Sequence, residues 1–480
     1  MIKDTKLKAV INAALHLSEE NEPSKEQLLS LHKLSARSKE IKALDGIEDC
    51  TNLEVLDLYN NYIEDLSPLH ALTNVKRLTL AKNSFSNMNV IASLTQLEYL
   101  DVSNNGIFPM DMSWIATLEK LKELNVNNCK IESLAGIDKL QHLTILHAGI
   151  TTPGFDIQVF STLTQLKELY LSKMWLYDIS ALANLVNLEV LDLSTNLFHD
   201  ASALTTMKHL KRLHINNNKY LHSIAFVEAL PELEVLNTSF TTIDSIAPLA
   251  SLNDLQDLRM ANSGIDDFSV LSTKTKMCKL DLSGNIIMDN SFLEGMEELV
   301  YLNLGSTQLR DISFMEKLVK VEECNIYNNK IKDISTLANC TSIKVLDLSN
   351  NEIKDISALA NLKDLEFLAL ANNQIEDITP LSELINLGSL NLYNNVVTDL
   401  KALSKLINLT SLILDHNGIY DLEPIKNLIY LSGLTLKANY IVDVTPLLNM
   451  KGLYELRLDN NPIADISVLD QMDYYDKFTY

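Results

Sequence analysis

Apolar and polar positions recur with a period of 22 residues along almost the whole chain. The frame reads L-x-x-L-x-L-x-x-N-x-I-x-x-I-x-x-L-x-x-L, and its clearest copy occupies residues 343–364. Twenty copies follow one another, and sixteen of the nineteen spacings between them are 22 residues. The exceptions are 24 residues after Leu97 and 23 residues after Leu143 and after Leu210. A register kept over 422 residues predicts a stack of coils rather than separate globules.

A single coil of this kind cannot fold alone. About seven buried apolar side chains contribute roughly 2 kcal/mol each, or about 14 kcal/mol. Ordering about 22 residues costs roughly 1–1.5 kcal/mol per residue, which is more. Each coil must therefore cover the open face of the next one.

Each coil contains the signals for one strand and one short turn. The L-x-L segment alternates with the period of a strand, and strands of neighbouring coils can pair in parallel about 4.8 Å apart. The second half, D-I-S-x-L-x-x-L, suits only a turn of 3-10 or α-helix. The expected fold is therefore α/β: a right-handed superhelical solenoid with one parallel sheet on its concave face and short turns on its convex face.

The two ends of the chain differ from the repeats. Leu7, Val10, Ile11, Ala14 and Leu15 fall on one helical face. The serine of the segment PSKEQLL, at position 24, is placed to cap a second short helix. We expect a helical cap over residues 1–30, about 20 repeats over 31–472 and a short tail over 473–480. The tail either covers the open end of the stack or is loose.

The one polar slot inside the frame is asparagine in most coils. A carboxamide both donates and accepts, so a buried row of asparagines can satisfy backbone groups at the bend after each strand. Lys39 and Met174 cannot act in this way, and we expect a local distortion at Met174, which Trp175 follows. Cys129, Thr151, Thr241, Ser263 and Thr307 can replace part of the function. The asparagines of the slot are Asn61, Asn83, Asn105, Asn196, Asn218, Asn285, Asn329, Asn351, Asn373, Asn395, Asn417, Asn439 and Asn461.

A second column of the frame is aspartate. We favour a local role, in which each carboxylate accepts N–H groups of the turn that follows it. A column of calcium sites is the alternative, although calcium needs about six or more oxygen ligands and each coil supplies one carboxylate. The column consists of Asp65, Asp178, Asp200, Asp267, Asp289, Asp311, Asp333, Asp355, Asp377, Asp399, Asp421, Asp443 and Asp465.

With this frame, residues 31 to about 472 resemble the leucine-rich repeat family in its short 22-residue class. Bacterial internalins and a eukaryotic phosphatase-regulatory protein share that class. The helical segment that leads directly into the first coil is similar to the internalin cap. The resemblance implies a concave surface that binds another protein.

Composition limits the classes of partner. A net charge of −23 and a pI near 4.8 argue against nucleic acid and anionic membranes, and favour a basic or neutral protein. No apolar run approaches the roughly 18 residues of a membrane span. The first 20 residues do not read as a secretory signal. Five cysteines without a pairing pattern favour the cytoplasm, although a secreted or cell-surface protein whose signal was removed would look the same.

The sequence contains none of the phosphate-binding, dinucleotide-binding, zinc-protease or nucleophile-elbow motifs that we sought. His147 and His214 share an inner column, but three coils separate them by roughly 14 Å, so one metal cannot bridge them. We therefore expect no enzyme activity, no metal and no cofactor.

Function is instead expected on the inner surface, at the positions around L-x-L and before the asparagine slot. Tyrosine, tryptophan and arginine dominate binding energetics, although aromatic residues also stack between coils to stiffen a sheet. The irregular stretch 107–175 is a second place where function can have relaxed the frame. The candidate partner-binding residues are Tyr59, Tyr99, His147, Tyr170, Trp175, His214, Phe240, Arg259, Tyr301, Tyr327, Phe367, Tyr393 and His416, with Ile413 and Arg457 in the same columns.

The sequence thus predicts a non-enzymatic protein-binding module, most simply a monomer. Two alternatives stay open: a regulatory subunit of a partner enzyme, and a surface adhesin or ligand-binding protein of the internalin type.

Overall fold

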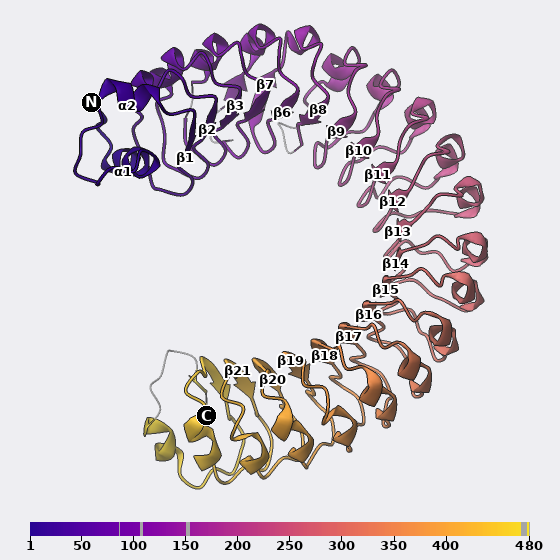
Figure 1. The fold of residues 1–480 in the computed structure, drawn as a ribbon. Coiled ribbons are helices and arrows are strands. Elements are labelled where there is room, and N and C mark those ends of the chain that lie inside the picture. The colour runs from indigo at the N-terminus through magenta and orange to yellow at the C-terminus, as the bar shows by residue number, and fades with distance from the viewer. Residues whose placement is uncertain (86, 106–108, 150–153, 472–477, 480) are drawn as a thin grey trace. The chain divides into compact units, whose positions relative to one another are not determined.

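The computed structural model describes residues 1–85, 87–105, 109–149, 154–471 and 478–479. The chain forms two compact units, Met1–Thr242 and Ile243–Tyr480, called unit 1 and unit 2 below. In each unit, short parallel strands form one face and short 3-10 helices form the opposite face (Figure 1). The solenoid architecture expected from the 22-residue frame is confirmed within both units. Its continuity between residues 242 and 243 stays a prediction.

Two helices begin unit 1. Helix α1 (Thr5–Ala14) is capped by Asp4, whose Oδ1 accepts hydrogen bonds from the N–H groups of Lys6 and Leu7. The other oxygen of Asp4 accepts the N–H groups of Lys42 and Ala43 at 2.8 and 3.2 Å. The same carboxylate therefore caps the helix and ties it to the loop after the first strand. Helix α2 (Lys25–Leu29) is capped by Ser24 as expected, and the side chain of Gln27 completes a capping box.

Unit 1 contains a parallel sheet whose strands follow the repeat. The middle residue of each strand is a buried leucine, and the two flanking side chains lie on the inner face. Adjacent strands pair in register, so Leu34 lies beside Leu56 and Leu56 beside Leu78. The strands are β1 (Lys33–Ser35), β2 (Val55–Asp57), β3 (Arg77–Thr79), β4 (Tyr99–Asp101), β6 (Glu123–Asn125), β8 (Ile145–His147), β9 (Glu168–Tyr170), β10 (Val190–Asp192), β11 (Arg212–His214) and β12 (Val235–Asn237).

Unit 2 repeats the arrangement. The chain end adds β23 (Phe478–Thr479), which pairs with β22, while residues 472–477 and 480 of the expected tail lie outside the described residues. The other strands are β13 (Asp257–Arg259), β14 (Lys279–Asp281), β15 (Tyr301–Asn303), β16 (Glu323–Asn325), β17 (Val345–Asp347), β18 (Phe367–Ala369), β19 (Ser389–Asn391), β20 (Ser411–Ile413), β21 (Gly433–Thr435) and β22 (Glu455–Arg457).

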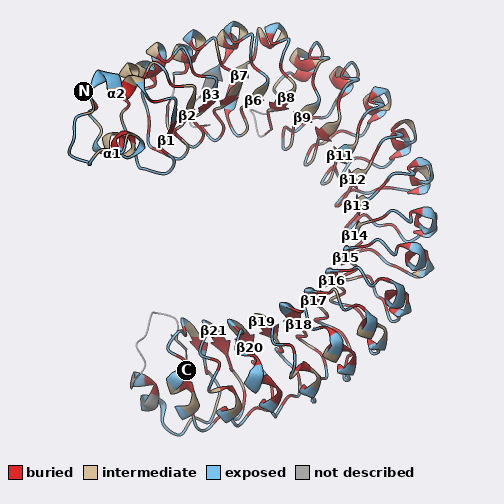
Figure 2. Cartoon of the chain, viewed as in Figure 1, coloured by how far each residue is buried: buried red, intermediate tan, exposed pale blue. Residues whose placement is uncertain are grey.

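Opposite the strands, each coil forms a short 3-10 helix, and the core lies between the two layers (Figure 2). In unit 1 these helices are η1 (Ile47–Asp49), η2 (Ser67–Ala71), η3 (Asn89–Ser93), η4 (Ser113–Thr117), η5 (Ile137–Lys139), η6 (Ile157–Phe160), η7 (Ser180–Leu182), η8 (Ser202–Thr206) and η9 (Ala225–Ala229). In unit 2 they are η10 (Ala247–Ser251), η11 (Ser269–Thr273), η12 (Ser291–Gly295), η13 (Ser313–Lys317), η14 (Ser335–Asn339), η15 (Ser357–Asn361), η16 (Thr379–Leu381), η17 (Lys401–Lys405), η18 (Glu423–Ile425), η19 (Thr445–Asn449) and η20 (Ile466–Gln471).

The asparagine slot forms the expected hydrogen-bonded row, called the asparagine ladder below. Asn351 is buried, and its Nδ2 donates to the carbonyls of Ile326 and Leu348, both at 3.0 Å. Its Oδ1 accepts the N–H of Ile331 in the preceding coil at 3.1 Å. In the other asparagines of the slot, Nδ2 also donates hydrogen bonds to two carbonyls that lie earlier in the chain, as in Asn373 and Asn395. The ladder thus joins each coil to the one before it.

Coils without a slot asparagine use partial substitutes. The Cys129 thiol lies 3.2 Å from the Val102 carbonyl, and the Thr307 hydroxyl donates to the Leu304 carbonyl at 2.7 Å. Thr151 lies outside the described residues. Met174 is buried in the slot and makes no such bond among the described contacts. The distortion expected there is present, because Trp175 has a φ of 60°, a backbone conformation that is costly for a bulky side chain.

The local role of the aspartate column is confirmed. In all thirteen coils the carboxylate accepts the N–H group two residues later, as Asp333 does from Ser335 at 2.8 Å. The N–H donor lowers the pKa of Asp267, Asp289 and Asp333, with the serine side chain two residues later adding to the effect. Asn87 makes the same bond with the N–H of Asn89 at 2.9 Å, so a neutral amide also suffices.

This column predicts acid sensitivity. Because the folded-state pKa of Asp267, Asp289 and Asp333 lies below the ordinary value of 3.8, their stabilising effect is present above pH 3.8 and is lost as the pH falls through the folded-state value. A variant with Asp267, Asp289 and Asp333 replaced by asparagine should keep the turns and lose less stability in acid. Thermal melts followed by circular dichroism at pH 7 and in acid would measure this difference.

The matched control replaces three exposed aspartates outside the column, Asp244, Asp266 and Asp364, by asparagine. If both triple variants changed the acid dependence equally, the column would have no special role.

The irregular stretch adds a small sheet that the sequence did not predict. Strand β5 (Pro109–Asp111) pairs in parallel with β7 (Lys130–Ser133), and the register shifts between Met110 and Asp111. Residues 106–108 and 150–153 of this stretch lie outside the described residues. The extra residues of the 24-residue coil are therefore accommodated beside the main sheet, which keeps its register between Tyr99 and Glu123.

Candidate interaction surface

The inner strand face of unit 1 is the surface formed by the side chains on and just after the strands of its main sheet, β1 to β4, β6 and β8 to β12. Each side chain is placed by a paired strand, so its position repeats from coil to coil at the spacing of parallel strands, about 4.8 Å. A surface held in this way is stiff, and its side chains lose little freedom on binding. The face contains rings, cations and carboxylates rather than a closed cavity.

At its N-terminal end, a ring is covered by a cation of the chain itself. The Arg37 guanidinium lies 4.3 Å from the centroid of the Tyr59 ring and donates to Asp57 at 2.9 Å. The ammonium of Lys82 lies 5.3 Å from the same ring. Tyr59, a predicted binding residue, is thus half-buried between two cations.

The next ring along the face has the same arrangement. The Arg77 guanidinium lies 4.0 Å from the centroid of the Tyr99 ring. Burial, reinforced by the charges of Asp101 and Glu123, raises the pKa of Tyr99 above its ordinary value. The phenol is therefore neutral at physiological pH, and Tyr99 acts as an apolar ring with a hydroxyl at its edge.

In the middle of the face, His147 and Tyr170 form a stacked pair. Their ring centroids are 4.2 Å apart and their planes differ by 5°. The Tyr170 hydroxyl donates to Glu168 Oε2 at 2.8 Å; burial first, and this bond second, raise the pKa of Tyr170 to about 12. Burial lowers the pKa of His147, so its imidazole is neutral at pH 7. The structure thus brings together two residues that the sequence analysis had named separately.

Carboxylates surround the stacked pair. Asp101, Glu123, Glu168 and Asp192 all lie on strands of this part of the face. Burial raises the pKa of Glu123, and the charges of Glu168 and Asp101 raise it further, while Arg77 opposes them. A partly dehydrated carboxylate beside like charges is a group that gains from a cation brought by a partner.

Trp175 and Phe240 lie at the rim, just beyond the strands. Trp175 is 59% exposed and Phe240 52% exposed. Both have a φ of 60°, the left-handed region that is unusual for bulky residues. At Phe240 this conformation belongs to the repeat, because the equivalent residues Asn217 and Asn262 also have a positive φ. His214 lies on β11, two strands beyond Tyr170 and three beyond His147, as the column predicted.

The predicted residues of unit 2 are more dispersed. Tyr393 and His416 form an edge-to-face pair with centroids 5.3 Å apart. Tyr327 lies so close to Gly305 that a Cβ there would meet its ring at 2.4 Å. Among the others, Phe367 is exposed, Tyr301 and Ile413 are half-buried, Arg259 makes two hydrogen bonds to Asp257, and Arg457 pairs with Glu455.

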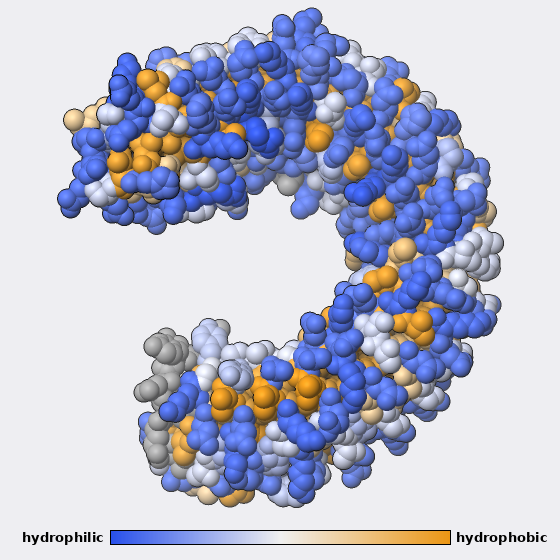
Figure 3. Space-filling view, in the orientation of Figure 1, coloured by the Kyte–Doolittle hydropathy of each residue, from blue (hydrophilic) through white to orange (hydrophobic). Residues whose placement is uncertain are grey.

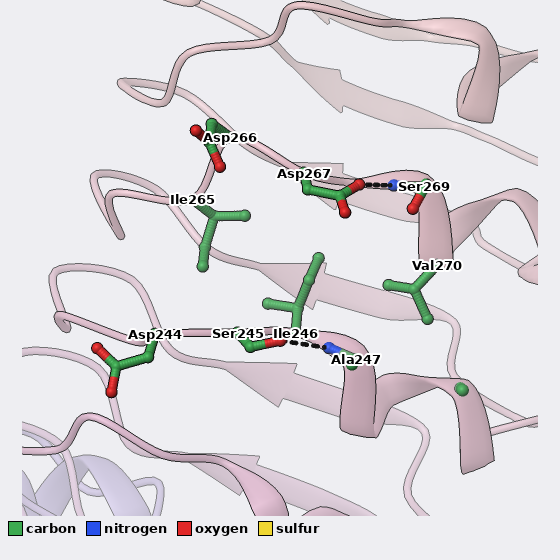
Figure 4. A pocket seen from close by; sticks show the side chains of 10 residues that line it. Asp244, Ser245, Ile246, Ala247, Ile265, Asp266, Asp267, Ser269 and Val270 are labelled. Atoms are coloured by element: carbon green, nitrogen blue, oxygen red, sulfur yellow. Dashed lines mark hydrogen bonds between the residues drawn. The ribbon is translucent and has the colours of Figure 1, made fainter.

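Grooves between the coils are a second candidate. One groove on the repeats lies between the coils of η10 and η11 in unit 2 and measures about 500 Å³. Ile246 and Ile265 lie inside it, and Asp244 and Asp266 at one end (Figure 4). Equivalent grooves are lined by residues between 131 and 159 in unit 1 and between 287 and 330 in unit 2. The groove is therefore a general consequence of stacking, and Asp267 within it already caps a turn.

Exposed apolar side chains in unit 2 are a third candidate. Ile385, Ile407 and Ile429 are about half exposed and lie one coil apart. Figure 3 shows apolar patches over the coils of β18 to β21. These side chains lie before the strands rather than on the inner strand face, and the structure shows nothing that covers them.

Three further observations limit the chemistry of the described residues. They contain no group of three or more His, Cys, Asp or Glu side chains that could hold a metal ion. None of their helices has the length and apolar character needed to cross a bilayer. All five cysteines are free, and only Cys278 is not fully buried, as its place outside the apolar columns indicated.

Sequence reasoning missed the residues that accompany the rings. Arg37 and Tyr59, and likewise Arg77 and Tyr99, share a column and are separated by one 22-residue period. This 22-residue separation could have predicted from the sequence that each arginine contacts the tyrosine ring of the next coil. The roles of Glu123 and Glu168 depend on burial and on neighbouring charges, which no single coil of sequence shows.

Comparisons with known proteins agree with this architecture. A family model described as "Leucine Rich repeats (2 copies)" matches residues 29–69, 164–206, 323–361 and 363–405. A search of curated proteins finds no significant match. An internalin C2 from Listeria monocytogenes is 34% identical over 39% of this chain and 83% of its own, with a TM-score of 0.36. An internalin, InlF, from the same organism is 24% identical over 90% and 94%, with a TM-score of 0.34.

The fold itself is matched better by a plant receptor. The HAESA ectodomain from Arabidopsis, solved in complex with an IDA peptide hormone ligand, is 19% identical over 92% of this chain and 81% of its own. Its TM-score is 0.64, and at this identity the likeness shows the fold alone. The expected similarity to phosphatase-regulatory proteins stays a prediction.

Proposed function

Because the chain belongs to the leucine-rich repeat family, we propose that it is a non-enzymatic module that binds a partner protein through the inner strand face of unit 1. Solved neighbours include a receptor ectodomain that holds a peptide hormone, which supports protein or peptide binding as the general role. The observation that carries the proposal is the His147–Tyr170 stack, which lies half-buried on adjacent paired strands.

Three features of the stack suit binding. The rings are fixed by their strands and by each other, so they offer contact area at low entropic cost. Glu168 holds the Tyr170 hydroxyl, which orients the ring further. Carboxylates nearby favour a partner that is basic, and the net charge of −23 would attract it from a distance.

Replacing Tyr170, His214 and Phe240 together by alanine tests the proposal. Removing central aromatic contacts typically costs more than 1 kcal/mol each, so we expect capture of the partner to fall at least about tenfold. The measurement is quantitative mass spectrometry of the protein captured by the immobilised chain, and circular dichroism confirms folding.

The matched control replaces Tyr420, Tyr430 and Tyr440 by alanine, three tyrosines of unit 2 that are about two-thirds exposed and lie off the strands. Capture of the same protein should survive this change. Equal capture by the wild type and by a folded variant lacking Tyr170, His214 and Phe240 would rule out the proposed surface.

We further propose that the protein works in a reducing compartment such as the cytoplasm. Four of the five cysteines are buried as small core residues and all five are free. Burial raises the pKa of Cys50 to about 12 and that of Cys129 and Cys340 to about 11, which keeps these thiols protonated and unreactive.

A further inference from the structure

The rings of the inner strand face repeat one contact. Twice, an arginine of one coil lies over the ring of a tyrosine in the next coil: Arg37 over Tyr59, and Arg77 over Tyr99. In the first of these pairs a carboxylate also takes part, because Asp57 accepts a hydrogen bond from the Arg37 guanidinium. The chain itself therefore shows that this surface accommodates a guanidinium against a ring and a carboxylate.

The third ring, Tyr170, has no arginine over it in the described part of the chain. Over Tyr170 the preceding coil places His147, whose lowered pKa leaves it neutral. None of the cation–ring contacts among the described residues involves this pair. The ring stack is retained at this place, but none of these described contacts places a cation over it; the charges of Arg212 and Arg77 act on Tyr170 and Glu123 without lying over the rings.

Two glutamates, Glu123 and Glu168, lie beside the stacked pair, where they could bind a positive charge. In the sheet register, Ile145 lies directly between Glu123 and Glu168, one strand away from each. The strand spacing separates the two glutamates by roughly 10 Å, with the half-buried Ile145 below and His147 beside them. Neither glutamate has an ion pair among the described salt bridges. A planar group with donors on two sides fits this arrangement, and an ammonium fits it less well.

We propose that the partner protein inserts an arginine side chain here, with its guanidinium over Ile145, between Glu123 and Glu168 and against the edge of the His147–Tyr170 stack. This inference deepens the proposed function and rests on it. The stem of the arginine would cover Ile145, its two sets of N–H donors would reach one carboxylate each, and the rings would provide the cation–π contact that Arg37 and Arg77 make elsewhere.

The electrostatics of the site agree with this occupant. Burial raises the pKa of Glu123, and the charges of Glu168 and Asp101 add to the effect, while the charge of Arg77 opposes it without reversing it. A bound guanidinium would favour the ionised carboxylate and draw a proton from it, so binding should weaken as the pH falls through the raised pKa of Glu123. An apolar occupant would not show this pH dependence.

The test uses the whole chain and two fluorescein-labelled peptides, one of alternating arginine and glycine and one of alternating lysine and glycine. Fluorescence anisotropy at about 150 mM salt limits long-range attraction to the acidic surface. We expect the arginine peptide to bind the wild type about tenfold more tightly than the lysine peptide. The variant E123Q/E168Q should bind the arginine peptide about tenfold more weakly and lose the preference for arginine.

The matched variant E316Q/E376Q has the same net charge and changes two exposed glutamates of unit 2. It should bind the arginine peptide within about twofold of the wild type. Equal weakening by both double variants, or equal affinity of the wild type for the two peptides, would overturn the arginine site. Lowering the pH should weaken binding of the arginine peptide to the wild type more than to E123Q.

The two proposals fail separately. Loss of partner capture by the variant without Tyr170, His214 and Phe240, combined with no discrimination between the peptides, would keep the binding surface and remove the arginine site. Full capture by that variant would remove the surface itself.

Discussion

Replacing Asn351 by alanine is expected to lower the free energy of unfolding by about 3–5 kcal/mol. The Asn351 amide donates to two buried carbonyls at 3.0 Å, and its oxygen accepts the N–H of Ile331 at 3.1 Å. Alanine would leave the buried N–H of Ile331 without a partner. The carbonyls of Ile326 and Leu348 would each lose one hydrogen bond and keep the one that Asn329 or Asn373 donates. The unsatisfied N–H costs roughly 1–3 kcal/mol and each of the two lost hydrogen bonds about 0.5–1.5 kcal/mol, and the sum exceeds the effect of a typical single substitution.

The measurement is urea unfolding, combined with hydrogen exchange at the Ile331 amide to detect local opening in a protein built from repeats. Asn361 provides the control, because it lies in the same coil, is exposed, and can be changed to alanine without touching the ladder. The ladder would not be the source of stability if both alanine variants unfolded at the same urea concentration.

Replacing Lys274 by methionine is expected to stabilise the protein by roughly 1–3 kcal/mol at pH 7. Lys274 is 3% exposed and occupies the apolar column at the end of η11, where the neighbouring coils have Leu252 and Met296. Its ammonium donates to the carbonyls of Leu252 at 2.8 Å and Ala250 at 3.1 Å. Burying this charge against neutral carbonyls is costly, and methionine is already the residue that the next coil uses.

The local geometry gives a second reason. Leu252 has a ψ of 86°, whereas the equivalent residues Lys274 and Met296 have 60° and 49°. In the coils that follow, the N–H three residues later closes the turn, as Met277 does onto the Lys274 carbonyl at 3.2 Å. The Leu252 carbonyl instead accepts a hydrogen bond from the Lys274 ammonium. Methionine would allow the turn to close as in its neighbours.

The expected gain depends on pH in a defined direction. Burial lowers the pKa of Lys274 below its ordinary value of 10.5, so the folded protein releases this proton before the unfolded chain does. The wild type should therefore gain stability as the pH rises from the lowered pKa towards 10.5, and its deficit relative to the methionine variant should shrink. Thermal melts between pH 7 and pH 10 measure this, with the exposed Lys354 changed to methionine as the control. A destabilised Lys274 variant would show that the two hydrogen bonds outweigh the burial of charge.

The fold could be predicted because the same constraints recur in every coil. A buried amide at the slot and a carboxylate before the turn each satisfy backbone groups within one or two coils, so thirteen copies of each pattern indicated the same geometry. Met174 shows that exceptions were informative as well, since the residue that follows it adopts the left-handed conformation.

The candidate site could be predicted only as a set of columns. Which rings touch depends on side-chain packing between coils, and which carboxylates lack a cation depends on the whole face. Lys274 stands out in the sequence as a charged residue in an apolar column, but its two carbonyl partners depend on the local backbone of the coil before it. The sheet of β5 and β7 arises from extra residues that no repeat describes.

The asparagine ladder has a direction. Each amide bonds to a carbonyl 25 residues earlier, and its oxygen accepts N–H groups 20 to 22 residues earlier, so a coil that precedes a slot asparagine is completed by the one that follows. A ribosome delivers the chain from its N-terminus, and the newest coil to emerge therefore has unsatisfied backbone groups until the next one has been made. Folding during synthesis thus trails translation by one repeat, and a nascent chain that stalls always presents one unfinished coil.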